Sequence, residues 1–108
     1  LFRSPEDFIT VIKYLDEHQR LVMLRSLVEA GGSLNDSIFQ DCLDRYAPGK
    51  VSRDQVKTHI SWLEEQGLVR VETLGSCMVA TLTGRGQDVA EGRSSVPGVK
   101  KPRIGGQP

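Results

Sequence analysis

The side chains best suited to chemistry in this sequence lie on one predicted helix, over residues 53–66. With about 100° between successive residues, its outward face carries short polar side chains with a cation on one flank. Cations neutralise phosphates and hydroxyl groups hydrogen-bond to base edges, so this face could contact double-stranded DNA. Asp54, Glu64 and Glu65 would repel phosphate, which favours the N-terminal half of the helix. The candidate contact residues are Arg53, Lys57, Thr58 and Ser61.

The overall charge argues against strong DNA binding. The chain has 14 basic and 14 acidic residues, so its formal net charge is zero, whereas nucleic-acid binders usually present a basic patch. Residues 96–108 hold the only local excess of basic residues. These cations could form either a solubilising tail or a basic arm that reaches DNA. They are Lys100, Lys101 and Arg103.

No sequence pattern indicates an enzyme or a metal site. The chain has no glycine-rich phosphate loop and no closely spaced set of carboxylates and histidines. Cys42 and Cys77 are far apart and have no histidine neighbour, so we expect buried reduced thiols. We therefore predict no catalytic residue, no metal, no cofactor and no small-molecule effector.

Length and hydropathy set the broad class of the protein. A chain of 108 residues can build one hydrophobic core but not two. No apolar run approaches the roughly 20 residues that cross a bilayer, and the first residues lack the pattern of a signal peptide. A single domain with tails and a cytoplasmic location are therefore predicted.

The helix that carries the candidate residues has clear start and stop signals. Ser52 is a good N-cap, and Gln55 completes a capping box with it. Gly67 supplies the left-handed residue that ends the helix. The buried stripe should consist of residues at helical spacing, which we expect to pack with Leu24 and Phe39: Val56, Ile60 and Leu63.

The pattern over residues 5–30 predicts helix but leaves its continuity open. Ser4 is a suitable cap and Pro5 a suitable first residue. The polar run 16–20 interrupts the apolar pattern, so one long helix and two abutting helices are both possible, and a break near residue 16 is favoured. The helix in residues 1–16 then needs a partner for its apolar face, either the same domain or a second copy in a homodimer. That face contains Phe8, Ile12 and Leu15.

A helix is expected to open at Ser33 and to break at Ala47-Pro-Gly-Lys50. Alternating residues then predict strands over 68–74 and 77–82, joined by Gly75-Ser76 as a type II′ turn. Thr83 caps a last short helix.

These elements define the predicted fold class and domains. Three helices, a hairpin and a closing helix form a winged helix-turn-helix domain over residues 17–92, mainly α with a small β-hairpin. Residues 93–108 lack periodicity and contain Pro, Gly, Ser and basic residues, which predicts a flexible basic tail.

Particular segments resemble known families. Ile60-Ser-Trp-Leu-Glu-Glu-Gln-Gly-Leu-Val69 is similar to a recognition helix entering a wing, and Thr81-Leu-Thr-Gly-Arg-Gly-Gln-Asp-Val-Ala90 to the segment after the wing in bacterial regulators. A longer resemblance is to a small winged-helix family of Mu-like phages and prophages that is often described as ArsR-like. It covers nearly everything after the first helix and is carried by residues 20–25, 33–37, 51–54 and 96–101.

This resemblance implies a phage or prophage setting and DNA-binding transcription regulation. The metal-sensing cysteine motif of ArsR-type sensors is absent from the sequence, so metal responsiveness is not implied. A second hypothesis is a winged-helix protein-protein interaction module without DNA binding. Two further side chains bear on packing: we expect His59 to be packed and hydrogen-bonded, and Trp62 to be a partly buried support for the hairpin or part of a protein contact.

Overall fold

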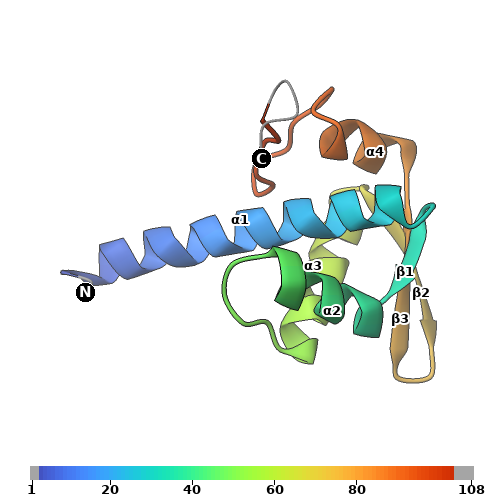
Figure 1. Ribbon diagram of the computed structural model, residues 1–108, viewed down its shortest axis with the longest axis horizontal. Coiled ribbons are helices and arrows are strands. Elements are labelled where there is room, and N and C mark those ends of the chain that lie inside the picture. Colours follow the sequence, from blue (N-terminus) through green and yellow to red (C-terminus); the bar gives the residue numbers. More distant parts are fainter. Residues whose placement is uncertain (1–2, 104–108) are drawn as a thin grey trace.

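The computed structural model describes residues 3–103, which form four helices and a small sheet. In chain order the elements are α1 (Pro5–Glu29), β1 (Ser33–Asn35), α2 (Asp36–Tyr46), α3 (Arg53–Glu65), β2 (Val69–Leu74), β3 (Cys77–Leu82) and α4 (Gly84–Ala90). The strands pair antiparallel in the order β1-β3-β2. In Figure 1 the sheet stands at one end of the helical body, and α4 lies across α1 from α2. The predicted winged helix-turn-helix architecture is confirmed.

α1 is one continuous helix of 25 residues, so the predicted break near residue 16 is wrong. The polar run does not interrupt the helix because its residues make tertiary hydrogen bonds where apolar packing was expected. The Gln19 amide donates to the Pro48 carbonyl (3.2 Å), and the Arg20 guanidinium donates to the Gly98 carbonyl (3.0 Å). The N-terminal turns of α1 therefore extend the same helix beyond the body of the domain (Figure 1).

The second helix starts two residues later than expected. Ser33–Asn35 form β1, which pairs with Val79–Thr81 of β3, and Asn35 rather than Ser33 caps α2 by accepting a hydrogen bond from the Ile38 amide (2.9 Å). A strand this short has no periodicity of its own, and a serine three residues before an acid also fits a helix start. The predicted two-stranded hairpin is consequently a three-stranded sheet.

The wing hairpin of β2 and β3 turns at Gly75-Ser76, as predicted. Gly75 has φ +64°, and no residue other than glycine has a positive φ in the described part of the chain. Among the primed hairpin turns, only type II′ combines a positive φ at the first central residue with a negative φ at the second. The turn type expected from the sequence is thus supported.

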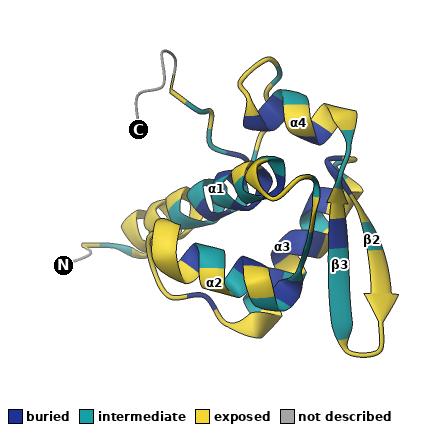
Figure 2. Cartoon of the chain, turned by 45° about the vertical axis from the view of Figure 1, so that its right-hand side comes forward, coloured by how far each residue is buried: buried dark blue, intermediate teal, exposed yellow. Residues whose placement is uncertain are grey.

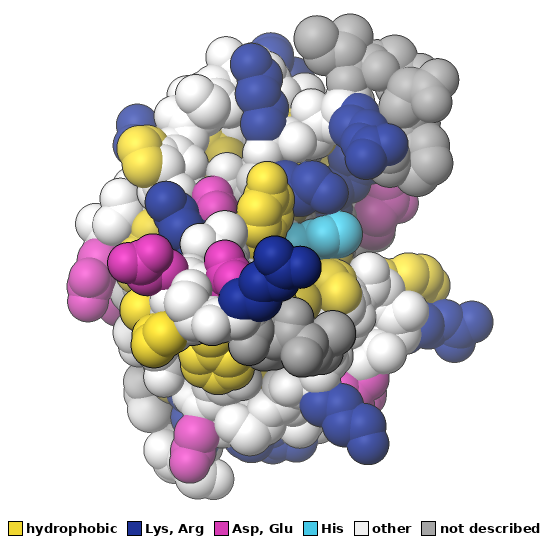
Figure 3. Space-filling view, turned by 90° about the vertical axis from the view of Figure 1, so that its left-hand side faces the viewer, with side chains coloured by type: hydrophobic (Ala, Val, Ile, Leu, Met, Phe, Trp, Pro, Cys, Tyr) yellow, Lys and Arg dark blue, Asp and Glu magenta, His cyan; other side chains and the backbone are white. Residues whose placement is uncertain are grey.

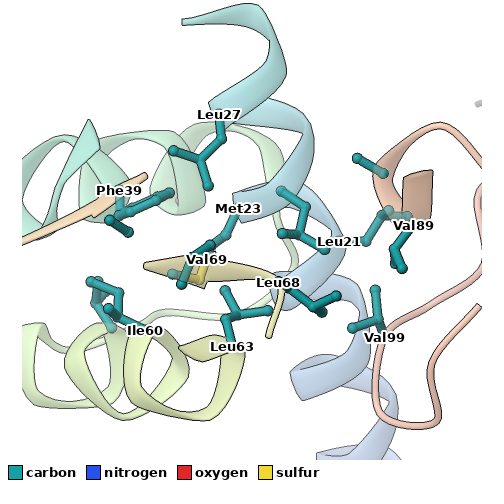
Figure 4. Packing of buried hydrophobic residues seen from close by; sticks show 14 of the residues in the cluster. Leu21, Met23, Leu27, Phe39, Ile60, Leu63, Leu68, Val69, Val89 and Val99 are labelled. Atoms are coloured by element: carbon teal, nitrogen blue, oxygen red, sulfur yellow. The ribbon is translucent and has the colours of Figure 1, made fainter. Parts of the chain in front are cut away.

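The hydrophobic core lies between α1, α2, α3 and the base of the sheet. The five residues predicted to pack there are all fully buried: Leu24, Phe39, Val56, Ile60 and Leu63. Figure 2 shows buried residues on the sides of the helices that face one another, and Figure 4 shows their side chains meeting between α1 and α3. Gly86 lets α4 approach the sheet, because a Cβ at that position would lie 2.0 Å from the Leu68 carbonyl oxygen.

Residues 93–103 are packed against α1 rather than forming the predicted flexible tail. Val96 and Val99 are buried, and the Lys100 amide donates to the Glu17 carbonyl (3.1 Å). The two valines lie in a segment rich in proline and glycine, where no periodicity reveals that they are buried. Residues 104–108 of the predicted tail lie outside the described residues.

Trp62 is partly buried, as expected, but its contacts are with α1 and the C-terminal segment. The Arg20 guanidinium lies 4.1 Å from the centre of the indole ring. Gly98 sits against the same ring, where a Cβ would come within 2.5 Å of Trp62 Cζ2. Trp62 thus joins α3 to α1 and to the C-terminal segment.

His59 is a buried hydrogen-bonded side chain, as predicted. Arg20 Nε donates to His59 Nδ1 (3.3 Å), so Nε2 carries the ring proton and donates to the Gln19 side-chain oxygen (2.9 Å). Burial and the neighbouring Arg20 charge lower the pKa of His59 to about 4, against the opposing effect of Asp16. The imidazole is therefore neutral at pH 7 and links α1 to α3.

This pKa predicts a loss of stability in mild acid. The unfolded chain binds a proton at its histidines near pH 6.5, whereas folded His59 does not until about pH 4. The stabilisation from keeping His59 neutral is complete above pH 6.5 and is lost as the pH falls toward 4. When the pH falls from 7 to 5, His59 should therefore lower the free energy of unfolding by about 2 kcal/mol. Urea titrations should show a smaller loss over this interval for His59→Gln than for wild type, and equal losses would contradict the assignment.

Candidate nucleic-acid interface

The exposed side of α3 is the candidate interface. The Ser52 hydroxyl caps the helix by accepting from the Gln55 amide (3.1 Å), and the apolar side of α3 is anchored in the core. Thr58 and Ser61 are exposed on the opposite side. The structure brings three of the predicted residues together in one shallow depression of about 350 Å³, which is lined by Lys57, Thr58, Ser61, Trp62 and Glu65.

Lys57 is held between α3 and the wing. Its Nζ donates to the Ser76 carbonyl in the wing turn (2.9 Å) and lies 3.8 Å from the Asp36 carboxylate. Asp36 is buried, and its oxygens also accept hydrogen bonds from the Cys77 thiol (3.6 Å) and the Met78 amide (3.4 Å). Lys57 therefore fixes the position of the wing relative to α3, and only part of its charge faces outward.

Arg53 is the more available cation at the start of α3. It is exposed, and its Nε donates to the Gln40 side-chain oxygen of α2 (2.8 Å). Gln40 in turn donates to the Val51 carbonyl in the turn between the two helices (3.1 Å). This pair of hydrogen bonds orients the Arg53 guanidinium at the junction of α2 and α3 without burying it.

The predicted basic arm lies elsewhere. Lys100, Lys101 and Arg103 line a groove with residues of α1 and α2, and no residue of α3 lines that groove. The structure therefore does not bring these three cations together with the candidate residues of α3.

Two relevant residues were missed in the sequence. One is Asp36, which lies beside Lys57 (3.8 Å), because nothing in the sequence links positions 21 residues apart. Arg70 is an exposed cation on β2 of the wing, and its outward position could have been inferred from the alternation of the strand.

Acidic groups restrict the useful part of α3. The exposed Asp54 places one negative charge in the first turn of α3, next to Arg53. At the other end Glu65 is exposed, and the Glu64 carboxylate accepts a hydrogen bond from the Val71 amide of β2 (3.3 Å). The C-terminal part of α3 therefore presents negative charge beside the wing, as the sequence predicts.

The structure gives no metal site within residues 3–103, where no group of three or more His, Cys, Asp or Glu side chains could hold an ion. Cys42 and Cys77 are free thiols that are half-buried, not fully buried as expected. Among the described residues, no helix is both long and apolar enough to span a membrane.

Comparisons with known proteins identify the family of the chain. Over 89 residues the chain is 58% identical to the uncharacterized protein gp26 of Escherichia phage Mu, covering 82% of this chain and 92% of that protein. The chain belongs to the gp26 family. An uncharacterized protein of Haemophilus influenzae is 53% identical over 72 residues, covering 66% of this chain and 70% of that protein. No family model matches the sequence.

The fold of this gp26-family member has a solved counterpart. F93 from STIV, described as a winged-helix DNA-binding protein, superimposes with a TM-score of 0.54 and 24% sequence identity, over 66% of this chain and 77% of F93. At that identity the likeness shows the shared fold alone, and it does not locate a binding site.

Proposed function

We propose that this gp26-family protein is a DNA-binding transcriptional regulator of phage or prophage type, with α3 as its recognition helix. The observation that carries the proposal is the exposed polar side of α3 next to a wing whose turn is fixed to that helix through Lys57. In helix-turn-helix proteins the N-terminal residues of the second helix enter the major groove. Such a regulator would act in the cytoplasm, where its DNA is.

Each predicted residue takes a role according to its position. Arg53 contacts the phosphate backbone as the exposed cation of the first turn, and Lys57 adds a weaker phosphate contact because the wing and Asp36 already engage it. Thr58 and Ser61 lie near base edges. Lys100, Lys101 and Arg103 contact DNA only if the DNA extends past α1. The proposal also includes a family relationship to ArsR-type regulators.

The test is DNA binding measured by fluorescence titration over several salt concentrations. The sites should be selected from a random pool at low salt, with unrelated DNA as a comparison. Arg53 and Lys57 are the only Lys or Arg residues of α3, so wild-type affinity should be modest and strongly salt-dependent. Arg53→Gln should weaken binding to all sequences and reduce the salt slope by about one unit. Ser61→Ala should instead change the preference among sites.

A matched control removes a cation from another surface. Arg93 is exposed but paired with Asp88 (2.9 Å) and Glu91 (2.6 Å) after α4, so Arg93→Gln should leave the salt slope unchanged. We prefer Arg53 to Lys57 for this test because Lys57→Glu would place a carboxylate beside Asp36 and disturb the wing. Equal binding by Arg53→Gln and wild type would remove the start of α3 from the interface.

The alternative function is a protein-protein interaction module without DNA binding. It is favoured by the apolar side chains exposed on the N-terminal half of α1 and by the zero net charge. Absence of wild-type binding at low salt would support this alternative.

As a regulator, the protein would act as a homodimer, since helix-turn-helix dimers meet half-sites about one DNA turn apart.

A further inference from the structure

A groove on the outer side of α1 plays no part in the proposed contact of α3 with DNA. Its volume is about 960 Å³, its floor is α1 from His18 to Glu29, and its walls are α2 and residues 100–103. Cations at its edge come from Arg25 and the C-terminal segment. The apolar lining consists of Leu21, Val22, Leu34, Ile38, Cys42 and Tyr46. Ile38 and Tyr46 are exposed, so this wall is open to solvent.

The first turns of the same helix carry a second exposed apolar surface. We call residues 5–15 of α1 the arm. Its side chains Val11, Ile12 and Tyr14 are 36%, 41% and 68% exposed. Figure 1 shows the arm projecting from the domain, and Figure 3, which faces its end, shows hydrophobic side chains and Lys or Arg close together on this side of the molecule.

The arm and the groove floor belong to one face of α1. Val11 and Leu15 of the arm continue in steps of three and four residues into the floor, which contains His18, Val22, Arg25 and Glu29. This spacing is that of a helix that pairs lengthwise with another helix. The arm and the floor also match in length, since 11 or 12 residues of α-helix span roughly 17 Å.

We propose that the groove receives the arm of a second copy of this chain, so that two α1 helices lie antiparallel across a two-fold axis. Each copy then gives one arm and receives one, which closes the dimer. A parallel arrangement would leave one arm and one groove unfilled. The inference extends the homodimer of the proposed function by naming its interface, and it does not depend on DNA binding.

In the antiparallel arrangement we infer a register in which apolar side chains of the two α1 helices lie opposite each other and opposite charges come close. Val11 lies opposite Val22 of the second copy, and Leu15 lies opposite its His18. Asp7, on the same side of the arm, comes within reach of Arg25 of the second copy. The N-terminal end of each arm also meets the C-terminal end of the other α1, where the helix dipoles attract.

The first test is the solution mass of the full chain by light scattering and sedimentation over a range of concentrations. Wild type should have twice the chain mass. Val11→Glu in the arm and Ile38→Glu in the groove wall each place a charge in the apolar contact and should weaken self-association by roughly tenfold or more. Lys13→Glu, on the opposite side of the arm, should leave the dimer intact. All three residues are exposed, so each variant should fold, and circular dichroism checks this.

The outcomes separate this interface from others. A wild-type monomer at all concentrations would overturn the proposal and leave the groove for another occupant, such as an acidic amphipathic ligand. Loss of the dimer with Val11→Glu but not with Ile38→Glu would also overturn it, because the arm would then dock outside the groove. A wild-type monomer would also remove the homodimer from the proposed function. Because mass is measured without DNA, neither result decides whether α3 contacts DNA.

Crosslinking tests the seating directly through the native Cys42 in the groove wall. In a Cys77→Ser background, Val11→Cys should link to Cys42 of the second copy with a short bifunctional thiol reagent. Lys13→Cys, on the opposite side of the arm, should link much less. A crosslinked dimer that survives when Cys42 is also changed to Ser would contradict the proposed contact.

Discussion

Leu63→Ala should lower the free energy of unfolding by about 2–5 kcal/mol, as truncation of a buried leucine does. Leu63 is fully buried on the inner side of α3, and Figure 4 shows its side chain in the middle of the core cluster. The loss combines the transfer energy of the removed methyl groups with the cavity left between α1, α3 and the sheet. Denaturant unfolding followed by circular dichroism measures it.

The control is Ser61→Ala, two residues away on the exposed side of the same helix. This substitution keeps the helix and touches no core position, so the free energy of unfolding should change by less than about 0.5 kcal/mol. A Leu63→Ala midpoint equal to that of wild type would show that the buried side of α3 is wrongly assigned, and with it the outward side proposed to meet DNA.

The starts of α1, α3 and α4 could be predicted because their signals are local. Ser4, Ser52 and Thr83 each accept a hydrogen bond from a backbone amide three residues on, as their positions in the sequence suggest. The core stripe of α3 follows from helical spacing alone. These features depend on neighbouring residues, which a sequence displays directly.

Features that depend on distant partners could not be predicted. Gln19 and Arg20 look like a break in the apolar pattern until His59 and Gly98 supply their hydrogen-bond partners. Val99 becomes a buried residue only because α1 passes beside it. In the candidate site, the sequence places Lys57 on an exposed flank, but its two partners, the Ser76 carbonyl of the wing turn and the Asp36 carboxylate of α2, lie 19 and 21 residues away in the sequence.

The second large effect on stability is expected for Asp36→Ala. The Asp36 carboxylate is buried at the start of α2 and accepts from two groups of β3 while facing Lys57 of α3. Its removal leaves the Met78 amide without this acceptor and Lys57 without its nearby carboxylate. We expect a loss of about 2–4 kcal/mol in unfolding free energy. Asp41→Ala, at an exposed position of α2, is the matched control and should cost far less.

Asp36→Ala should destabilise the wing more than the core, because Asp36 lies where α2, α3 and β3 meet. Hydrogen exchange at the Met78 amide should be faster in Asp36→Ala than in wild type, beyond the change that the global stability loss produces. Asp36→Asn keeps an oxygen that can accept from this amide but lacks the charge that attracts Lys57, so its stability should fall between those of wild type and Asp36→Ala. If Asp36→Ala and Asp41→Ala were equally stable, Asp36 would not help to position the wing, and the proposed joint surface of α3 and the wing would lose the support of this contact.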